Sequence, residues 1–171
     1  MIMQLSGIEF ENLIYENQSL IIKVCKFYCH SQTDIDDLFQ DITINLWRGL
    51  SSFKGKSKLS TWIYRVSINT AISRSMKLSR NKLIYPGKLP EKDVFDPDEK
   101  PGDEPLVKAL YQAIDQLKPI EKAIILLHLE EKPYRDISEI IGISEKNVGV
   151  KLVRIRKRLE SIIKDIVNSN I

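Results

Sequence analysis

The sequence predicts an all-α protein made of two small helical domains. Apolar residues recur at spacings of three, four and seven along most of the chain, which is typical of amphipathic helices, and no segment has the period of two expected of a strand. Five of the seven prolines lie within residues 86–105, in an acidic stretch, and proline at this density interrupts helices and sheet ladders. We therefore expect one domain over residues 1–81, a proline-rich linker over residues 82–104 and a second domain over residues 105–171.

The composition excludes several classes of protein. Hydrophobic residues make up 43% of the chain and charged residues 29%, which are globular values. No run approaches the ~20 apolar residues of a membrane span, and the N-terminus lacks the pattern of a secretory signal. Two cysteines cannot form a disulfide framework and fit a reducing compartment, so we expect a cytoplasmic protein. The glycine fingerprint of a nucleotide-binding enzyme is also absent.

Three helices are expected before the linker. A periodic apolar series from Leu13 to Tyr28 predicts the first. The second is expected over residues 34–49, with Thr33 as its N-cap, aspartates in its first turn and a glycine at its end. A basic loop leads to the third, over residues 59–79, which has Met76 among its apolar positions.

Four helices are expected after the linker. Prolines suit the first position of two of them, at Pro105 and Pro119. The apolar face of the first of these helices is expected to consist of Leu106, Leu110, Ile114 and Leu117. The last two are predicted over residues 134–141, ended by Gly142, and over residues 145–167, with a serine N-cap.

These last two helices have the pattern of a helix-turn-helix. A Gly–Ile–Ser turn separates them, and the second carries a predicted buried stripe with steps of four, three and four: Val148, Leu152, Ile155 and Leu159. Residues 145–158 hold six basic groups and one acidic group. A recognition helix enters the major groove after such a turn, and its lysines and arginines neutralise phosphates. The alternative is a solvated basic helix in an ordinary bundle, but the turn residues favour DNA binding.

The first domain carries two further candidate surfaces. The loop and third helix mix aromatic side chains with a possible phosphate track formed by Lys54, Lys56, Lys58, Arg65, Arg74, Lys77 and Arg80. Such a surface suits unstacked bases. The alternative is that Trp62 and Tyr64 are core aromatic residues, and for Trp62 this is the better explanation. The preceding helix carries a polar strip of Asp37, Gln40, Asp41 and Asn45, which is either a solvated face or a docking surface for a basic partner helix.

The chain resembles the small extracytoplasmic-function sigma factors of bacterial RNA polymerase. The resemblance to their region 2 extends over residues 34–80, a segment that begins with DIDDLFQDITINLWRGLSSFKGKSKLSTWIYRVSINTAISR. Residues 106–160, which end in SEIIGISEKNVGVKLVRIRKRLE, resemble their region 4, and the two segments cover about 100 of 171 residues. The resemblance implies a region 2 bundle and a region 4 helix-turn-helix joined by a short linker.

The resemblance also implies roles for particular residues. Asp37, Gln40 and Asp41 match the positions that grip the clamp helices of the polymerase. The positions that match the minus-ten reader are Lys56, Lys58, Trp62, Arg65 and Asn69. Of these, Asn69 is implied to hold a flipped non-template base, with the loop at residues 53–59 forming its pocket.

In region 4 the resemblance implies a minus-thirty-five reader on the last helix. The matching positions are Lys146, Asn147, Gly149, Val150, Lys151, Val153, Arg154 and Arg158. This chain departs from the family at Gly149 and Val150, where a basic residue and a serine are common. Glycine has no side chain that reaches a base, and valine offers only an apolar contact such as one with a thymine methyl group.

The expected partners are core RNA polymerase, promoter DNA and an anti-sigma factor, with no cofactor, metal, small-molecule substrate or catalytic residue. One alternative is a dimeric regulator that binds DNA without polymerase, which leaves the region 2 resemblance unexplained. The other is an enzyme, for which Cys25, Cys29 and His30 suggest a metal site. A tetrahedral zinc site usually needs four ligands, and His128 is the only other histidine, so buried thiols explain the cysteines better.

Overall fold

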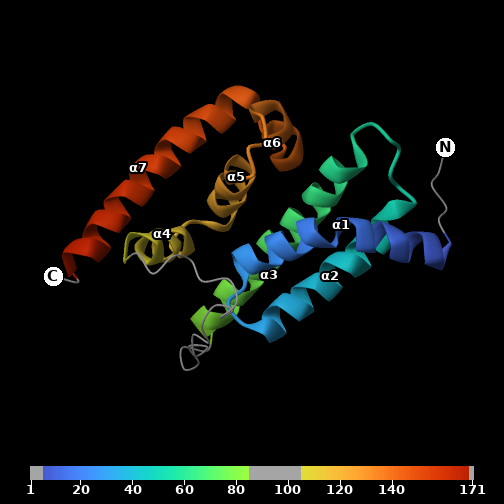
Figure 1. Ribbon diagram of the computed structural model, residues 1–171, viewed down its shortest axis with the longest axis horizontal. Helices are drawn as coiled ribbons and strands as arrows, with labels where there is room; N and C mark the ends of the chain where they lie inside the picture. Colours follow the sequence, from blue (N-terminus) through green and yellow to red (C-terminus); the bar gives the residue numbers. More distant parts are fainter. Residues whose placement is uncertain (1–5, 85–104, 170–171) are drawn as a thin grey trace. The chain divides into compact units, whose positions relative to one another are not determined.

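The computed structural model describes residues 6–84 and 105–169, and these residues form helices without strands. The chain divides into two compact units, Met1–Val94 and Phe95–Ile171, which are treated separately below. Unit 1 contains α1 (Gly7–Tyr28), α2 (Gln32–Leu50) and α3 (Leu59–Ile84) (Figure 1). Unit 2 contains α4 (Pro105–Asp115), α5 (Pro119–Leu129), α6 (Tyr134–Ile141) and α7 (Glu145–Ser169). The all-α fold predicted from the sequence is confirmed, whereas most of the expected linker, residues 85–104, lies outside the described residues.

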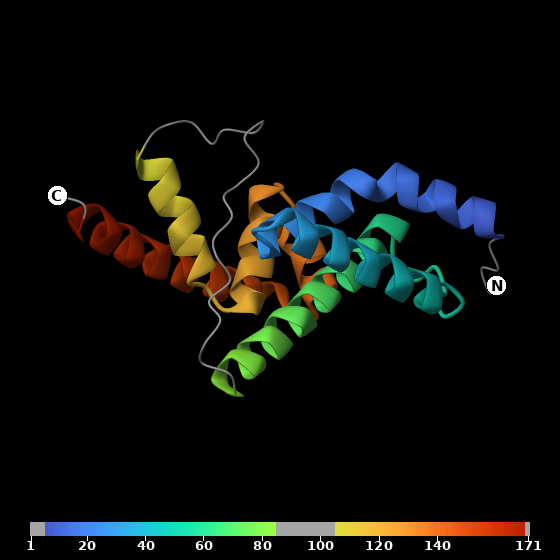
Figure 2. The same cartoon turned by 90° about the horizontal axis from the view of Figure 1, so that it is seen from below.

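The helices of unit 1 form a three-helix bundle in which each one packs against the other two (Figure 2). The centre of the bundle consists of aliphatic side chains that are almost completely buried: Ile21, Val24, Leu38, Ile42, Leu46, Ile63 and Ile68. At one edge the ring of Phe10 on α1 packs against Trp47 on α2, with centroids 4.9 Å apart. Burial of this apolar surface is the main favourable contribution to folding of the unit.

Two helix ends in unit 1 differ from the prediction. The N-cap of α2 is Ser31, not Thr33, because the Ser31 hydroxyl accepts a hydrogen bond from the Asp34 amide at 3.1 Å and donates one to its carboxylate at 2.8 Å. Helix α3 continues to Ile84 rather than Ser79, and therefore takes in residues 82–84, which were expected to be linker. No proline or glycine interrupts the chain before Pro86, so nothing local ends the helix earlier. Met76 was expected at an apolar position, but it is 55% exposed.

Unit 2 is organised around α7, against which α4, α5 and α6 all pack. The buried face of α4 differs from the expected one, because Leu106 and Leu110 are exposed while Ala109 and Ala113 are buried. The small alanine side chains allow α4 to approach α7 closely, and Ile114 and Leu117 complete the buried face. The predicted N-terminal positions of Pro105 and Pro119 are confirmed.

Candidate nucleic-acid and polymerase interfaces

The turn between α6 and α7 is fixed by its own residues. Gly142 has a φ of 80°, in the left-handed region that favours glycine, and its amide donates to the Ser138 carbonyl at 2.9 Å. The Ser138 hydroxyl donates to the carbonyl of Ile143. At the start of α7 the Ser144 hydroxyl accepts from the Asn147 amide at 3.3 Å, which confirms the predicted N-cap. The angle at which α7 leaves the turn is therefore set by local hydrogen bonds.

One side of α7 faces the interior of unit 2. Its predicted stripe is confirmed, because Val148, Leu152, Ile155 and Leu159 are at most 7% exposed. They belong to the same core as Ile137 and Ile140 on α6. This packing leaves the opposite side of α7 outward-facing, as the helix-turn-helix pattern requires.

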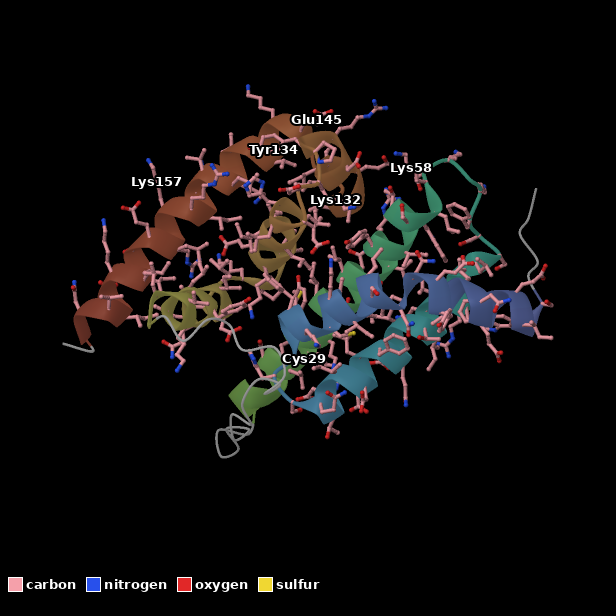
Figure 3. The ribbon with its side chains drawn as sticks, viewed as in Figure 1. Cys29, Lys58, Lys132, Tyr134, Glu145 and Lys157 are labelled. Carbon is pink, nitrogen blue, oxygen red and sulfur yellow. The ribbon has the colours of Figure 1, made fainter. Side chains whose placement is uncertain are left out.

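The outward side of α7 holds most of the residues expected at a DNA surface. Lys146, Asn147, Val150, Val153 and Arg154 are exposed, and Gly149 and Lys151 are half-buried. Lys157 is exposed one turn further along the helix and projects away from unit 2 (Figure 3). The exposed face thus has cations toward both ends and apolar residues between them.

Two arginines of α7 are turned toward α5 instead. The Arg158 guanidinium pairs with the Glu121 carboxylate at 3.2 Å and donates to the Gln116 carbonyl at 3.5 Å. Arg156 lies 2.7 Å from the Nε2 atom of His128. Arg158 was expected on the DNA surface, and in the structure its 43% exposed side chain also links α7 to α5. A local charge count could not distinguish it from its neighbours, because its partner is 37 residues away in the sequence.

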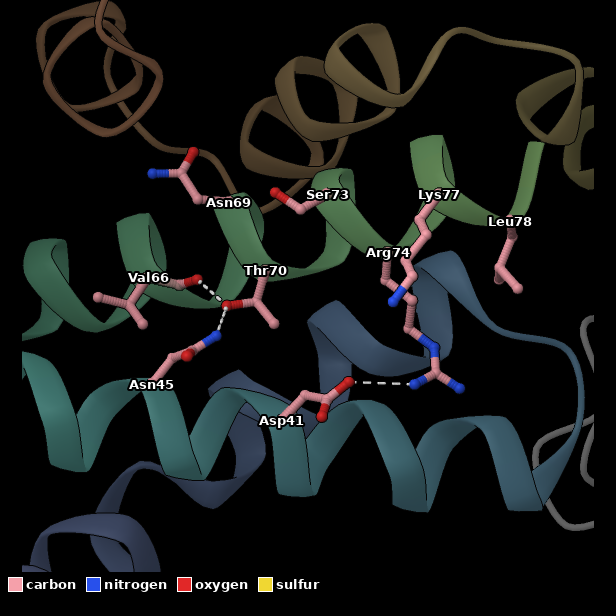
Figure 4. A pocket seen from close by; sticks show the side chains of 9 residues that line it. All are labelled: Asp41, Asn45, Val66, Asn69, Thr70, Ser73, Arg74, Lys77 and Leu78. Atoms are coloured by element: carbon pink, nitrogen blue, oxygen red, sulfur yellow. Dashed lines mark hydrogen bonds and ion pairs between the residues drawn. The ribbon is translucent and has the colours of Figure 1, made fainter. Parts of the chain in front are cut away.

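In unit 1, Asn69 is exposed on α3 and lines an open hollow of about 650 Å³. The other lining residues come from α2 and α3 and are Asp41, Asn45, Val66, Thr70, Ser73, Arg74, Lys77 and Leu78. Asn69 and Ser73 point away from α2, while Thr70 accepts from the Asn45 amide at 3.0 Å and donates to the Val66 carbonyl (Figure 4). No residue of the loop at 53–59 lines this hollow.

The loop before α3 is anchored by an aromatic contact. The rings of Phe53 and Trp62 have centroids 5.2 Å apart, and Trp62 is half-buried. A Cβ atom on Gly49 would lie 3.2 Å from the Trp62 ring, so the absence of a side chain there allows this close approach. Lys56 and Lys58 are exposed on the loop, and Arg65 is half-buried on α3. Trp62 therefore belongs at least partly to the core, as the alternative interpretation held.

Arg74 on α3 is bonded to three aspartates of α2. Its guanidinium lies 3.4 Å from Asp34, 3.3 Å from Asp37 and 3.1 Å from Asp41, and its side chain is only 23% exposed. Burial lowers the pKa of Arg74, but the hydrogen bonds to the three aspartates outweigh it and the net shift is upward. Arg74 was expected on a phosphate track, and the structure places it instead between α2 and α3. Asp37 and Asp41, expected at a polymerase surface, remain about half exposed while sharing this cation.

In the part of the chain that the structure describes, no group of three or more His, Cys, Asp and Glu side chains is placed to hold a metal ion. Cys25 is buried, and this burial raises the pKa of its thiol to about 12. Cys29 is half-buried and its thiol donates to the Asp34 carbonyl at 3.5 Å. In the same described residues, no helix is both long and apolar enough to cross a membrane.

Comparison with known proteins gives the same two-part division. Residues 13–81 match the family Sigma-70 region 2, and residues 108–159 match Sigma-70, region 4. The chain belongs to the sigma-70 family of sigma factors. It is 28% identical over 156 residues to the ECF RNA polymerase sigma-E factor of Haemophilus influenzae, covering 80% of this chain and 78% of that protein. It is 23% identical to the RNA polymerase sigma-H factor of Pseudomonas aeruginosa, and the match covers 92% of this chain and 88% of that protein.

Two solved structures have the same fold. The sigma factor RpoE, solved in complex with the anti-sigma factor NepR from Bartonella quintana, matches with a TM-score of 0.71 at 21% identity, covering 91% of this chain and 97% of that one. CnrH, solved in complex with the cytosolic domain of CnrY, matches with a TM-score of 0.64 at 15% identity, covering 94% and 90%. This sigma factor binds core RNA polymerase and promoter DNA and directs transcription initiation. Sigma factors are initiation factors and not enzymes.

Proposed function

We propose that this sigma factor divides promoter recognition between α3 and α7. In this assignment, the minus-ten element is contacted by Asn69, by Trp62 and Arg65 on the same helix, and by the loop lysines Lys56 and Lys58. The outward face of α7 contacts the minus-thirty-five element through Lys146, Asn147, Gly149, Val150, Lys151, Val153 and Arg154, while Arg158 is removed from the expected set because of its pairing with Glu121. Residues 1–84 and 105–171 act as the two functional domains, with residues 85–104 as their linker, because α3 continues to Ile84.

The observation that carries this proposal is the orientation of Asn69. Its neighbours on α3, Thr70 and Arg74, are bonded to α2, whereas Asn69 points away from α2. An exposed amide offers two donors and an acceptor, which suit the edge of an extruded base. Extrusion costs a few kcal/mol of stacking and pairing, and contacts of this kind offset that cost.

The test is the Asn69→Ala variant in promoter opening by holoenzyme reconstituted with core polymerase. We expect normal helicity and normal polymerase binding, but loss of permanganate reactivity at the thymines that are melted by the wild type. Ser73→Ala is the matched control, because Ser73 is exposed one turn further along the same side of α3. Wild-type opening by Asn69→Ala, with unchanged base preference, would remove Asn69 from this role.

For polymerase docking we propose Asp37, Gln40 and Asp41 on α2. Gln40 is the cleanest position to test, because it is exposed while both aspartates also neutralise Arg74. Gln40→Lys is expected to weaken binding to core polymerase measurably, since the proposed partner surface is basic and like charges repel. Glu16→Gln on α1 changes the net charge by the same amount and is expected to bind normally. Equal affinity of both variants and the wild type would contradict docking at Gln40.

We also propose that the protein acts in the cytoplasm, without catalytic activity of its own, and that an anti-sigma factor regulates it. The support is the likeness to RpoE and CnrH, whose structures were solved with the anti-sigma factor NepR and with CnrY. Affinity capture of the full chain from its own cells, followed by competition with core polymerase, tests the regulation. Recovery of a protein that blocks polymerase binding supports it. Recovery of core polymerase alone favours a sigma factor whose linker is a passive tether.

A further inference from the structure

The outward face of α7 has an apolar centre. Val150 is 42% exposed and Val153 53% exposed, and Tyr134, the first residue of α6, is 41% exposed beside Gly149. These four residues, Tyr134, Gly149, Val150 and Val153, are called the apolar patch below. Single exposed apolar side chains are ordinary on protein surfaces, but here they gather on the helix face that the proposed function directs to DNA.

Gly149 is not required by the backbone. Among the described glycines only Gly55 and Gly142 have a positive φ, so Gly149 has the ordinary conformation of a helical residue. A Cβ atom there would lie 3.5 Å from the Tyr134 ring, which is an ordinary van der Waals contact. A side chain would therefore fit, although glycine within a helix is the less stable choice. Because Gly149 has no side chain, no atom from this position covers the Tyr134 ring, which is 41% exposed.

The chemistry of the patch limits what it can recognise. Valine side chains donate and accept no hydrogen bonds and glycine has no side chain, so Gly149, Val150 and Val153 cannot distinguish bases by the polar groups of the major groove. Within the patch only the Tyr134 hydroxyl can form a hydrogen bond. The one apolar feature that a base presents there is the 5-methyl group of thymine. Lys146 lies one turn before the patch, the half-buried Lys151 lies between its valines, and Arg154 and Lys157 follow it. Cations around an apolar centre suit contacts with phosphates beside the base that is read.

We propose that the apolar patch selects thymine by its methyl group, so that the minus-thirty-five element of this sigma factor carries thymines at the base pairs facing Val150 and Val153. The inference rests on the proposed function, in which this face of α7 contacts that element. It deepens that function by stating the class of base that is recognised. The Tyr134 ring extends the patch from α7 to α6, which widens the surface over which a methyl group is buried.

The test begins with holoenzyme reconstituted from the full chain and core polymerase. Active promoters are selected from a library whose upstream element is randomised, and each enriched thymine is then replaced by deoxyuridine, which removes only the methyl group. We expect enriched thymines and about a fourfold loss of affinity for each methyl group that the patch buries.

Two variants connect the loss to the patch. In Val150→Ser and Val153→Ser the difference between thymine and uracil is expected to disappear at one base pair each. Val167→Ser is the matched control, because Val167 is an exposed valine on the same helix outside the patch. Equal binding of thymine and uracil promoters by the wild type, or an unchanged difference in both variants, would overturn the inference. Failure of the holoenzyme to initiate at any member of the library would instead contradict the proposed function.

Discussion

Arg74 in unit 1 and Lys157 in unit 2 are both basic residues on the long helix of their unit, yet their surroundings differ. Arg74 is 23% exposed and is surrounded by Asp34, Asp37 and Asp41 of α2. Lys157 is exposed and projects away from unit 2. Both units have a buried apolar core, but the central cation of α3 is enclosed between two helices, whereas most cations of α7 face outward.

The difference teaches that the burial and partners of a basic residue, not its presence in a basic segment, decide its role. Arg158 makes the same point within α7, because it is one residue from Lys157 and pairs with Glu121. Exposed ion pairs contribute little to stability, whereas removal of a partly buried cation that several carboxylates share leaves their charges uncompensated and costs more. Four predictions test this contrast between the two units.

The largest expected effect is on the stripe of unit 2. Leu152 is 1% exposed, so Leu152→Ala leaves a cavity and is expected to destabilise unit 2 by about 2–5 kcal/mol. Val150→Ala, on the exposed side of the same helix, is the control and should cost less than about 0.5 kcal/mol. Denaturant unfolding measures the stability of both variants, and amide hydrogen exchange shows in which helices protection is lost. Protection lost equally in α1–α3 and in α4–α7 would contradict the separate compactness of the two units.

The next largest effect concerns the cation of unit 1. Arg74→Ala leaves three neighbouring carboxylates without their shared partner, and we expect the free energy of unfolding to fall by about 1–3 kcal/mol. The effect is smaller than for a fully buried cation because those carboxylates are about half exposed. Arg80→Ala removes an exposed cation from the same helix and should change stability by less than about 0.5 kcal/mol. Chemical denaturation compares the two variants. Equal stability would mean that Arg74 is no more structural than a surface residue.

A smaller effect separates the two kinds of cation on α7. We assume that each of four cations of α7 neutralises one phosphate: Lys146, Lys151, Arg154 and Lys157. The logarithm of the binding constant for duplex DNA then falls with the logarithm of the salt concentration with a slope of about −3.6. Lys157→Gln should make the slope shallower by about 0.9, because one fewer counterion is released. Arg158→Gln should leave it unchanged, since that guanidinium pairs with Glu121. Fluorescence anisotropy with a selected promoter duplex measures the slopes. An equal change of slope in Lys157→Gln and Arg158→Gln would contradict the different roles of the two residues.

The smallest effect is a gain. Gly149→Ala should stabilise unit 2 by about 0.5–1 kcal/mol, because alanine restricts the unfolded chain and its Cβ meets the Tyr134 ring at an ordinary distance. Gly142→Ala is the opposite case, because Gly142 has a φ of 80° and alanine there is strained. Thermal unfolding shows whether Gly149→Ala is more stable, and Gly142→Ala less stable, than the wild type. Destabilisation by Gly149→Ala would mean that α7 needs a glycine at this position.

The sequence by itself determined the features that depend on neighbouring residues. The bounds of α6, its end at Gly142, the Ser144 cap and the buried stripe of α7 all follow from local periodicity and turn chemistry, and all are confirmed. The order of the two domain types was also evident, because each resembles its family over a continuous segment.

Only the tertiary structure decided which charged and apolar residues meet across helices. Arg74 and Asp41 are 33 residues apart, and no local pattern indicates that they are bonded. The burial of Ala109 in place of Leu106 likewise depends on how closely α4 approaches α7. The physical reason is that helical periodicity fixes which side chains share a face, whereas the partner opposite that face is set by the packing of helices distant in the sequence.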